Sequence, residues 1–187
     1  MRLATWNVNS VGARLPRLLP WLQEVAPDVV ALQETKCADA AFPYAELRAL
    51  GYEAAHAGDG RWNGVALLSR VGLEDVDLVQ PHPGQQGPEP RLVAAQCGPL
   101  HVTCVYVPNG RSLDDPHYAY KLAWLAGLLE RLGRQDLTGP VVVTGGSSPL
   151  PGGRCSRQST AGPGARDPGS LLWPGCARSS ADRAADF

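Results

Sequence analysis

An abrupt change in composition after Gly145 constrains the fold of this chain more than any other feature of its sequence. The first 145 of the 187 residues contain sixteen valines, and residues 146–187 contain none. Nineteen of those last 42 residues are glycine, proline or serine. A segment of this composition cannot bury enough apolar surface to offset its ordering entropy. We therefore expect one folded domain over residues 1–145 and an irregular or disordered tail over residues 146–187.

Within residues 1–145, short runs rich in valine, leucine and alanine alternate with amphipathic stretches, which is typical of a layered domain that mixes strands and helices. Turn-forming residues bound six predicted strands, at residues 3–8, 28–33, 64–69, 91–97, 100–106 and 140–144. Gly98 and Pro99 indicate a hairpin turn between two of these strands. The proline and glycine content of residues 81–90 predicts a loop.

Leucines at helical spacing predict two helices that pack on a sheet. The first set is Leu15, Leu18, Leu19 and Leu22, and the second is Leu122, Leu125, Leu128, Leu129 and Leu132. Pro20 disfavours a long first helix, so we expect that helix to start late or to be irregular at its first turn. Gly133 is expected to end the second helix as a C-terminal cap.

Charge and composition leave the partner open. The formal net charge is -1, so any contact with DNA must come from a local basic patch. No segment has the length and hydropathy of a signal peptide or a membrane span, so we expect a cytoplasmic protein with no membrane partner. The five cysteines lack C-x-x-C spacing, and the four histidines lack ligand spacing. We predict free thiols and assign the histidines no role.

Polar side chains follow two of the predicted strands at the point where each strand ends. The segment Thr5-Trp6-Asn7-Val8-Asn9-Ser10 ends the first strand, and Leu32-Gln33-Glu34-Thr35-Lys36 ends the second. Sites collect at strand ends, and a carboxylate with nearby amide oxygens offers the hard ligands that Mg²⁺ prefers. One carboxylate alone leaves an alternative open, in which Glu34 is a solvated loop residue.

Four motifs taken together resemble the exonuclease III branch of the endonuclease/exonuclease/phosphatase superfamily. They are W-N-V-N-S at residues 6–10, L-Q-E-T-K at residues 32–36, N-G-V-A-L-L-S-R at residues 63–70 and Y-V-P-N-G at residues 106–110. The resemblance covers about 145 residues. It implies an α+β fold, namely half of a DNase I-like two-sheet β-sandwich flanked by helices, followed by the irregular tail.

The resemblance also implies roles for individual residues. Glu34 would be the metal-binding carboxylate for Mg²⁺ (or Mn²⁺), and Asn7 beside it would orient the metal site or the scissile phosphate. Tyr106 would be the active-site tyrosine, whose hydroxyl can bond a phosphate oxygen. The alternative for Tyr106 is a core tyrosine within a strand.

Three further positions match residues that contact DNA in the family. Asn109 would lie on the substrate-facing loop, and Arg91 and Lys121 would contact the DNA backbone, where phosphates dominate affinity. For Arg91 and Lys121 the alternative is an ordinary surface charge. The implied partner is duplex DNA with abasic sites or 3′ ends, bound by a monomer.

The family pattern breaks immediately after residues 141–145. In the family this strand leads into a glycine-aspartate-phenylalanine-asparagine segment, and this chain instead reads Gly146-Ser147-Ser148. The aspartate expected at position 146 and the asparagine expected at position 148 are absent. No histidine follows His117 to match the family's C-terminal serine-aspartate-histidine segment. Because hydrolysis needs metal, oriented water and charge stabilisation together, we expect impaired activity in the chain as written.

The composition of the tail suggests a cause for this break. The chain has no isoleucine and fifteen arginines against two lysines, which is typical of a gene rich in G and C. Reading such DNA out of frame yields mainly the residue types that fill residues 146–187, so we hypothesise a frameshift just after codon 145. Because the family builds its sandwich from two similar halves, we also expect an unpaired apolar sheet face and marginal stability.

The function that these residues indicate is Mg²⁺-dependent hydrolysis of DNA phosphodiesters at abasic sites and 3′ ends, in base excision repair. The first alternative is a catalytically dead remnant with at most weak binding of DNA or metal. The second is a relative that acts on phospholipids or inositol phosphates, which the combination of L-Q-E-T-K with Y-V-P-N-G disfavours.

Overall fold

In the computed structural model, which describes residues 1–78, 89–134 and 139–147, two four-stranded β-sheets form the framework. The first sheet contains, in spatial order, β1 (Leu3–Asn7), β2 (Val29–Gln33), β4 (Val65–Ser69) and β3 (Glu53–Ala57). The second contains β5 (Glu74–Asp77), β6 (Leu92–Cys97), β7 (Leu100–Val107) and β8 (Val141–Ser147). β1 and β2 run parallel, as do β7 and β8, and the other pairs are antiparallel.

The two sheets pack face to face. Val29, Ala31 and Leu67 of the first sheet share one buried cluster with Val93 and Val102 of the second. These side chains alternate along their strands with residues on the other face of the sheet, such as Val30 and Leu32, which are buried in a second cluster with residues of α1. The expected two-sheet α+β architecture is confirmed. The expected unpaired sheet face is confirmed only in part. Each sheet covers the inner face of the other, but on the edge strand β8 Val141 and Val143 are 41% and 44% exposed.

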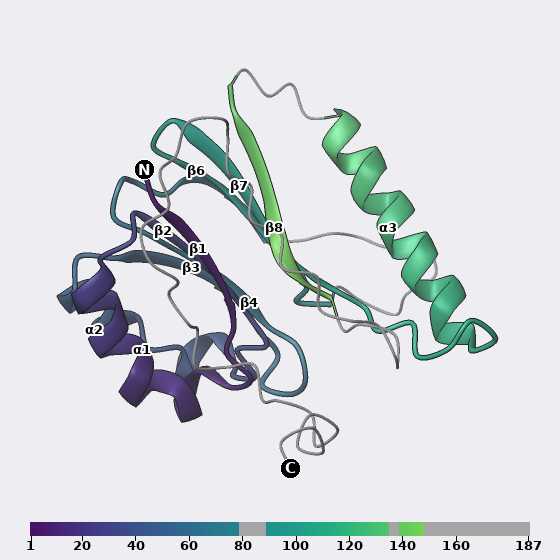
Figure 1. Ribbon diagram of the computed structural model, residues 1–187, viewed down its shortest axis with the longest axis horizontal. Coiled ribbons are helices and arrows are strands. Elements are labelled where there is room, and N and C mark those ends of the chain that lie inside the picture. Colours follow the sequence, from purple (N-terminus) through teal and green to yellow (C-terminus); the bar gives the residue numbers. More distant parts are fainter. Residues whose placement is uncertain (79–88, 135–138, 148–187) are drawn as a thin grey trace, which may run out of the picture. The chain divides into compact units, whose positions relative to one another are not determined.

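Helices cover the outer faces of both sheets (Figure 1). α1 (Val11–Val25) and α2 (Tyr44–Ala49) pack on the first sheet, and a short 3-10 helix, η1 (Asp39–Ala41), precedes α2. α3 (Pro116–Arg134) packs on the second sheet, where Trp124 and Leu128 contact Leu92 and Val105. Both leucine patterns therefore mark helices that pack on a sheet, as predicted.

The expected late or irregular start of the first helix is wrong. α1 begins at Val11, its N-cap residue Ser10 accepts a hydrogen bond from the Ala13 amide, and the helix continues through Pro16 and Pro20. The two prolines lie four residues apart on the exposed side of the helix. Water can therefore satisfy the carbonyls that lose their intrahelical partner, and the buried leucines hold the helix in place.

The expected cap at Gly133 is also wrong, because α3 includes both Gly133 and Arg134. No heavy atom lies within 4 Å of a Cβ built on Gly133, so nothing around it demands glycine. A glycine inside a helix costs only about 1 kcal/mol relative to alanine, which the packing of Trp124 and Leu128 can outweigh. No helix within the described ranges is both long and apolar enough to cross a membrane.

All six predicted strands are present, and the structure adds two. β3 reads Glu-Ala-Ala-His-Ala, whose alanines carry little strand propensity, and β5 reads Glu-Asp-Val-Asp, which is exposed throughout and pairs irregularly with β6. The predicted hairpin at Gly98 and Pro99 joins β6 to β7, as expected. The predicted loop lies outside the described residues except for Glu89 and Pro90, and the predicted tail lies outside them from residue 148 onward.

Candidate metal-dependent active site

The carboxyl ends of two parallel strand pairs, one in each sheet, meet at one end of the sandwich. In the first sheet Asn7 of β1 lies opposite Gln33 of β2, and in the second sheet Tyr106 of β7 lies opposite Gly146 of β8. β8 also packs against β1 and β2 across the interface between the sheets. Polar residues at the ends of β1, β2 and β7 therefore gather at one place, beside Gly146 of β8.

Glu34 is the carboxylate at the centre of this cluster. Asn7 donates from Nδ2 to Oε1 of Glu34 at 2.6 Å, and Lys36 Nζ lies 3.0 Å from Oε2. The Tyr106 hydroxyl adds a hydrogen bond from the second sheet. Burial alone would raise the pKa of Glu34, but the hydrogen bonds from Asn7, Lys36 and Tyr106 outweigh it and hold the pKa below its usual value. Glu34 is therefore ionised at neutral pH.

The backbone that presents Glu34 is strained. Glu34 and Lys36 have φ angles of 54° and 51°, in the left-handed region that costs non-glycine residues roughly 1–3 kcal/mol each. Neighbouring segments hold this turn, because the Ser10 amide donates to the Glu34 carbonyl at 2.7 Å and the Lys36 amide donates to the Asn63 carbonyl at 3.0 Å. The turn therefore depends on loops that follow β1 and precede β4.

Asn7 is oriented by hydrogen bonds on both sides of its amide. While its Nδ2 donates to Glu34, its Oδ1 accepts from the Asn9 amide at 3.1 Å. The Asn9 side chain in turn accepts a hydrogen bond from Lys36 Nζ. The sequence placed Asn7 beside Glu34, which the structure bears out in position. It gave no role to Lys36, although Lys36 sits in the same motif and contacts both Glu34 and Asn9.

Gln33 lies beneath the cluster and supports it from inside the sandwich. Its side chain is 1% exposed, and Nε2 donates to Thr5 Oγ1, to the Ala31 carbonyl and to Cys104 Sγ at 3.0, 3.1 and 3.2 Å. Burial raises the pKa of Cys104 to about 12, so its thiol stays neutral. Gln33 ties the first sheet to the second and is not an accessible oxygen ligand for a metal.

Arg91 contacts the active-site end of β7 and is not an ordinary surface charge. Its guanidinium lies 5.1 Å from the centre of the Tyr106 ring, donates to the Tyr106 carbonyl at 3.3 Å and pairs with Glu89. Tyr120 donates to the same Glu89 carboxylate at 3.0 Å. These contacts fix the side chain of Tyr106 on β7 and connect it, through Arg91 and Glu89, to Tyr120 on α3.

Asn109 and Lys121 lie together on the neighbouring loop and helix. Asn109 is exposed, and its Oδ1 accepts a hydrogen bond from the Arg111 amide at 2.9 Å, which shapes the loop after β7. A Cβ on Gly110 would lie 3.2 Å from Lys121 Cδ, so the Lys121 stem packs directly under this loop. No described contact joins either residue to Glu34, and their contact with DNA stays a prediction.

The donor set at Glu34 fits a hard cation. The Glu34 carboxylate offers about four lone-pair sites, and Asn7, Lys36 and Tyr106 use three of them, which leaves one for a metal. No group of three or more His, Cys, Asp or Glu side chains in the described part of the chain is arranged to hold an ion. Mg²⁺ is commonly bound through one or two carboxylates, with water and substrate phosphate completing its shell. The residues at this site therefore fit Mg²⁺ better than a metal that needs a full protein cage.

Comparison with known protein families identifies the fold. The model of the endonuclease/exonuclease/phosphatase family matches residues 4–146, which is most of the chain. The chain belongs to this family. The match contains all four motifs on which the resemblance was based, and it ends at residue 146, within β8.

The relatives within the family are DNA-processing enzymes. The chain is 30% identical over 151 residues to exodeoxyribonuclease III of Haemophilus influenzae, covering 78% of this chain and 56% of that protein. It is 27% identical over 160 residues to DNA repair nuclease APEX1 of Danio rerio, covering 78% and 48%. The resemblance to exonuclease III-type enzymes is confirmed, and the chain spans about half the length of these relatives.

Solved structures agree with this assignment. An AP endonuclease from Archaeoglobus fulgidus superposes with a TM-score of 0.72 at 36% identity, covering 78% of this chain and 56% of that one. The 3′ phosphatase NExo from Neisseria, solved with a product DNA hairpin, superposes with a TM-score of 0.69 at 35% identity and the same coverage. The described sandwich therefore has the fold of these structures over a little more than half of their length.

Position 146 departs from the family pattern at the site itself. A Cβ built on Gly146 would lie 3.8 Å from both Asn7 Nδ2 and Gln33 Oε1, with no nearer heavy atom, so a side chain there would enter the Glu34 cluster. A Cβ on Gly145 would instead lie 1.9 Å from the Val105 carbonyl oxygen. The backbone thus provides a place for the family's aspartate, and the chain carries glycine there.

Proposed function

We propose that this chain is the amino-terminal part of a Mg²⁺-dependent DNA phosphodiester hydrolase of exonuclease III type. Its substrates would be abasic sites and 3′ ends of duplex DNA in base excision repair, and it would act as a monomer in the cytoplasm. The observation that carries this proposal is the ionised Glu34 carboxylate held by Asn7, Lys36 and Tyr106 where the strands of both sheets end. The names of the relatives support the substrate class.

In this proposal each residue has a defined task. Glu34 and Asn7 hold the Mg²⁺ site, Glu34 as a direct ligand and Asn7 by fixing its carboxylate. The bound metal would supply Lewis-acid stabilisation of the phosphoryl group. The Tyr106 hydroxyl, whose single proton bonds Glu34 in the free protein, would turn that proton to a phosphate oxygen when substrate binds, from a position that the Arg91 guanidinium fixes.

DNA would be held at the rim of the site. Asn109 and Lys121 lie together on the loop after β7 and on α3, where they can reach phosphates on either side of the scissile bond. Arg91 would add positive charge to this surface, although its pairing with Glu89 reduces that contribution. Contacts of this kind position the duplex and carry no sequence information, which suits an enzyme that acts on damage.

A second candidate is a catalytically inactive remnant that binds DNA or metal weakly. The glycine at position 146 favours it, because the side chain expected to help position the water is missing where the backbone leaves room for it. We retain the hypothesis that a frameshift after codon 145 produced residues 146–187, which would divide the chain into residues 1–145 and a tail. Translating the other two frames downstream tests it, because neither frame should encode the expected segments if the hypothesis is wrong.

Cleavage of an abasic-site duplex by the purified full chain, with and without Mg²⁺, tests the proposed activity. Glu34→Gln removes the metal-binding charge, and Glu24→Gln on the exposed face of α1 is the matched control. Removing a metal ligand costs orders of magnitude in rate, so cleavage should disappear in the first variant and persist in the second. No cleavage by the unmodified chain would contradict the enzyme and favour the remnant.

A further inference from the structure

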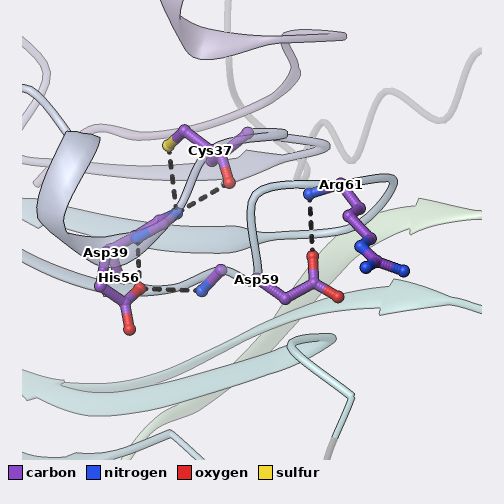
Figure 2. A network of polar contacts seen from close by, with 7 residues as sticks. Cys37, Asp39, His56, Asp59 and Arg61 are labelled. Atoms are coloured by element: carbon purple, nitrogen blue, oxygen red, sulfur yellow. Dashed lines mark hydrogen bonds and ion pairs between the residues drawn. The ribbon is translucent and has the colours of Figure 1, made fainter.

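A buried histidine lies directly behind the turn that presents Glu34. His56 on β3 is 3% exposed, and its ring stacks on Phe42 with centroids 4.2 Å apart and planes 17° from parallel. Figure 2 shows the ring enclosed by polar groups on both nitrogens. Nε2 lies 2.8 Å from Thr35 Oγ1, and Nδ1 lies 2.7 Å from Asp39 Oδ1. These contacts at both nitrogens and on the ring face hold the buried His56 ring in one orientation.

Thr35 is the middle residue of the strained turn, between Glu34 and Lys36. It is completely buried, its amide donates to the Gly64 carbonyl at 3.2 Å, and its carbonyl accepts from the Val11 amide at 2.8 Å. Its hydroxyl lies 2.8 Å from His56 Nε2, and the Cys37 thiol also forms a side-chain hydrogen bond with Thr35. Both neighbours of Thr35, Glu34 and Lys36, have positive φ, so the buried Thr35 lies between the two strained residues of the turn.

Gly58 lies so close to His56 that no side chain fits at position 58. A Cβ on Gly58 would lie 2.2 Å from the Cys37 carbonyl oxygen and 2.4 Å from His56 Cε1. The Gly58 amide donates to Asp39 Oδ1 at 2.9 Å, the same oxygen that faces the ring. The loop after β3 therefore presses on the ring and fixes Asp39 beside it.

Asp39 sets the polarity of the ring. The contact at Nδ1 is close but does not have the alignment of a full hydrogen bond, so it acts mainly through charge. A carboxylate beside Nδ1 favours the tautomer that carries its proton there, which leaves Nε2 as an acceptor. Burial lowers the pKa of His56 more than Asp39 raises it, so the ring is neutral at pH 7. The Thr35 hydroxyl is then the donor to Nε2.

The neighbouring thiol offers no competing explanation. Cys37 Sγ lies 3.8 Å from His56 Nε2, which is longer than the bond to Thr35. Burial raises the pKa of Cys37 above its usual value, and it outweighs a hydrogen bond with Thr35, which lowers the pKa; the charge of Asp39 raises it further. A thiol that is neutral at pH 7 and shares an already occupied nitrogen is not an activated nucleophile.

We propose that His56 and Asp39 are positioning residues that fix Thr35 and thereby hold Glu34 in its metal-binding direction. Neither residue touches the carboxylate, and both act through the turn. The importance of this arrangement for metal binding rests on the proposed role of Glu34. The fixing of the turn does not, so the two can be tested apart.

Two substitutions of the histidine separate its two contacts. His56→Gln places an amide near the Nε2 position and keeps an acceptor for Thr35, whereas His56→Asn places its amide near Nδ1 and cannot reach Thr35. Thr35→Val removes the hydroxyl and keeps the volume, which provides a third variant that does not alter the histidine. If the proposal is right, the turn at Thr35 remains as stable in His56→Gln as in the unmodified chain, and it becomes less stable in His56→Asn and in Thr35→Val.

Amide hydrogen exchange in the metal-free full chain measures this loosening. The Val11 amide donates to the Thr35 carbonyl, and the Lys36 amide donates to the Asn63 carbonyl. Both amides should exchange about tenfold faster in Thr35→Val and His56→Asn, as expected for a lost buried hydrogen bond. In His56→Gln they should exchange as in the unmodified chain. Amides of β6, such as Val93, report global opening. The proposal is overturned if the exchange rates of the turn amides are unchanged in Thr35→Val, or if exchange at Val93 accelerates by the same factor. If His56→Asn does not fold, the exchange rates of Thr35→Val alone decide between these outcomes.

Mn²⁺ affinity, measured by electron paramagnetic resonance on the same four proteins, completes the test. It should fall about tenfold in Thr35→Val and His56→Asn and recover in His56→Gln, in parallel with the exchange rates. If the unmodified chain binds no Mn²⁺ while the exchange pattern holds, the proposed function fails and the positioning of the turn stands. If Mn²⁺ binds and the exchange pattern is absent, the positioning fails and the proposed function stands.

Discussion

Gly64 faces the Glu34 turn, and replacing it with alanine should destabilise the protein in two separable ways. Its φ of +106° is one that side chains rarely adopt, and a Cβ there would lie 2.0 Å from Thr35 Oγ1 and 3.3 Å from the Lys36 nitrogen. Gly72 is the matched control, because its φ of +98° is similar and no heavy atom lies within 4 Å of its Cβ position. The difference between the two variants therefore isolates the clash with the turn.

The expected magnitudes follow from these two terms. Holding alanine at positive φ costs roughly 1–2 kcal/mol, and forcing an extra methyl into a packed site costs roughly 1–3 kcal/mol more. Gly72→Ala should therefore lower the free energy of unfolding by about 1–2 kcal/mol, and Gly64→Ala by about 2–5 kcal/mol.

Urea denaturation measures both free energies, provided that the dependence on urea concentration is the same for the two variants. Gly64→Ala should also weaken Mn²⁺ binding, because Thr35 must move, and Gly72→Ala should not. The reasoning is refuted if Gly64→Ala is no more destabilising than Gly72→Ala, since the buried Thr35 hydroxyl would then not be fixed against Gly64.

Three further predictions follow from the same contacts. Because the pKa of Glu34 is lowered in the folded state, its hydrogen bonds should stabilise the protein above about pH 4.5 and lose that effect as the pH falls through the folded pKa. Glu34→Gln should therefore flatten this part of the curve of unfolding free energy against pH. An unchanged curve would refute the contacts assigned to Glu34. Gly146→Asp should raise Mn²⁺ affinity about tenfold by adding a second carboxylate at a position where a Cβ makes only ordinary van der Waals contacts. Gly145→Asp should prevent folding because its Cβ would meet the Val105 carbonyl. Circular dichroism tests folding, and calorimetric titration tests the affinity. Lys121→Ala should reduce the slope of log affinity for duplex DNA against log salt by about one, and an unchanged slope would remove Lys121 from the DNA surface.

Much of the fold could be predicted from the sequence because the strands are apolar runs with clear boundaries. The runs that became β2 and β4 are fully buried and end at polar residues, so periodicity and turn residues define them well. β5 could not be found in this way, because it is an exposed edge strand with three acidic residues. The prolines of α1 misled the prediction because their cost depends on whether they face solvent, which only the packed structure decides.

The site was predictable only as far as its residues follow strand ends. Asn7 and Glu34 end neighbouring parallel strands, so their proximity follows from the strand order once the motifs are recognised. The position of His56 behind Thr35 depends on β3 pairing with β4 at the edge of the first sheet, which no local pattern reveals. Gln33 shows the limit of this reasoning. It also ends a strand, but its side chain turns inward and links the two sheets.

Locating a bound cation tests the central claim most directly. Crystals of the full chain grown or soaked with Mn²⁺ should give an anomalous scattering peak roughly 2.0–2.2 Å from an oxygen of Glu34, close to Asn7. The same crystals of Glu34→Gln should lack that peak. Mn²⁺ bound only at other side chains, or no peak at Glu34 at saturating Mn²⁺, would contradict the account of this carboxylate as the metal ligand of the active site.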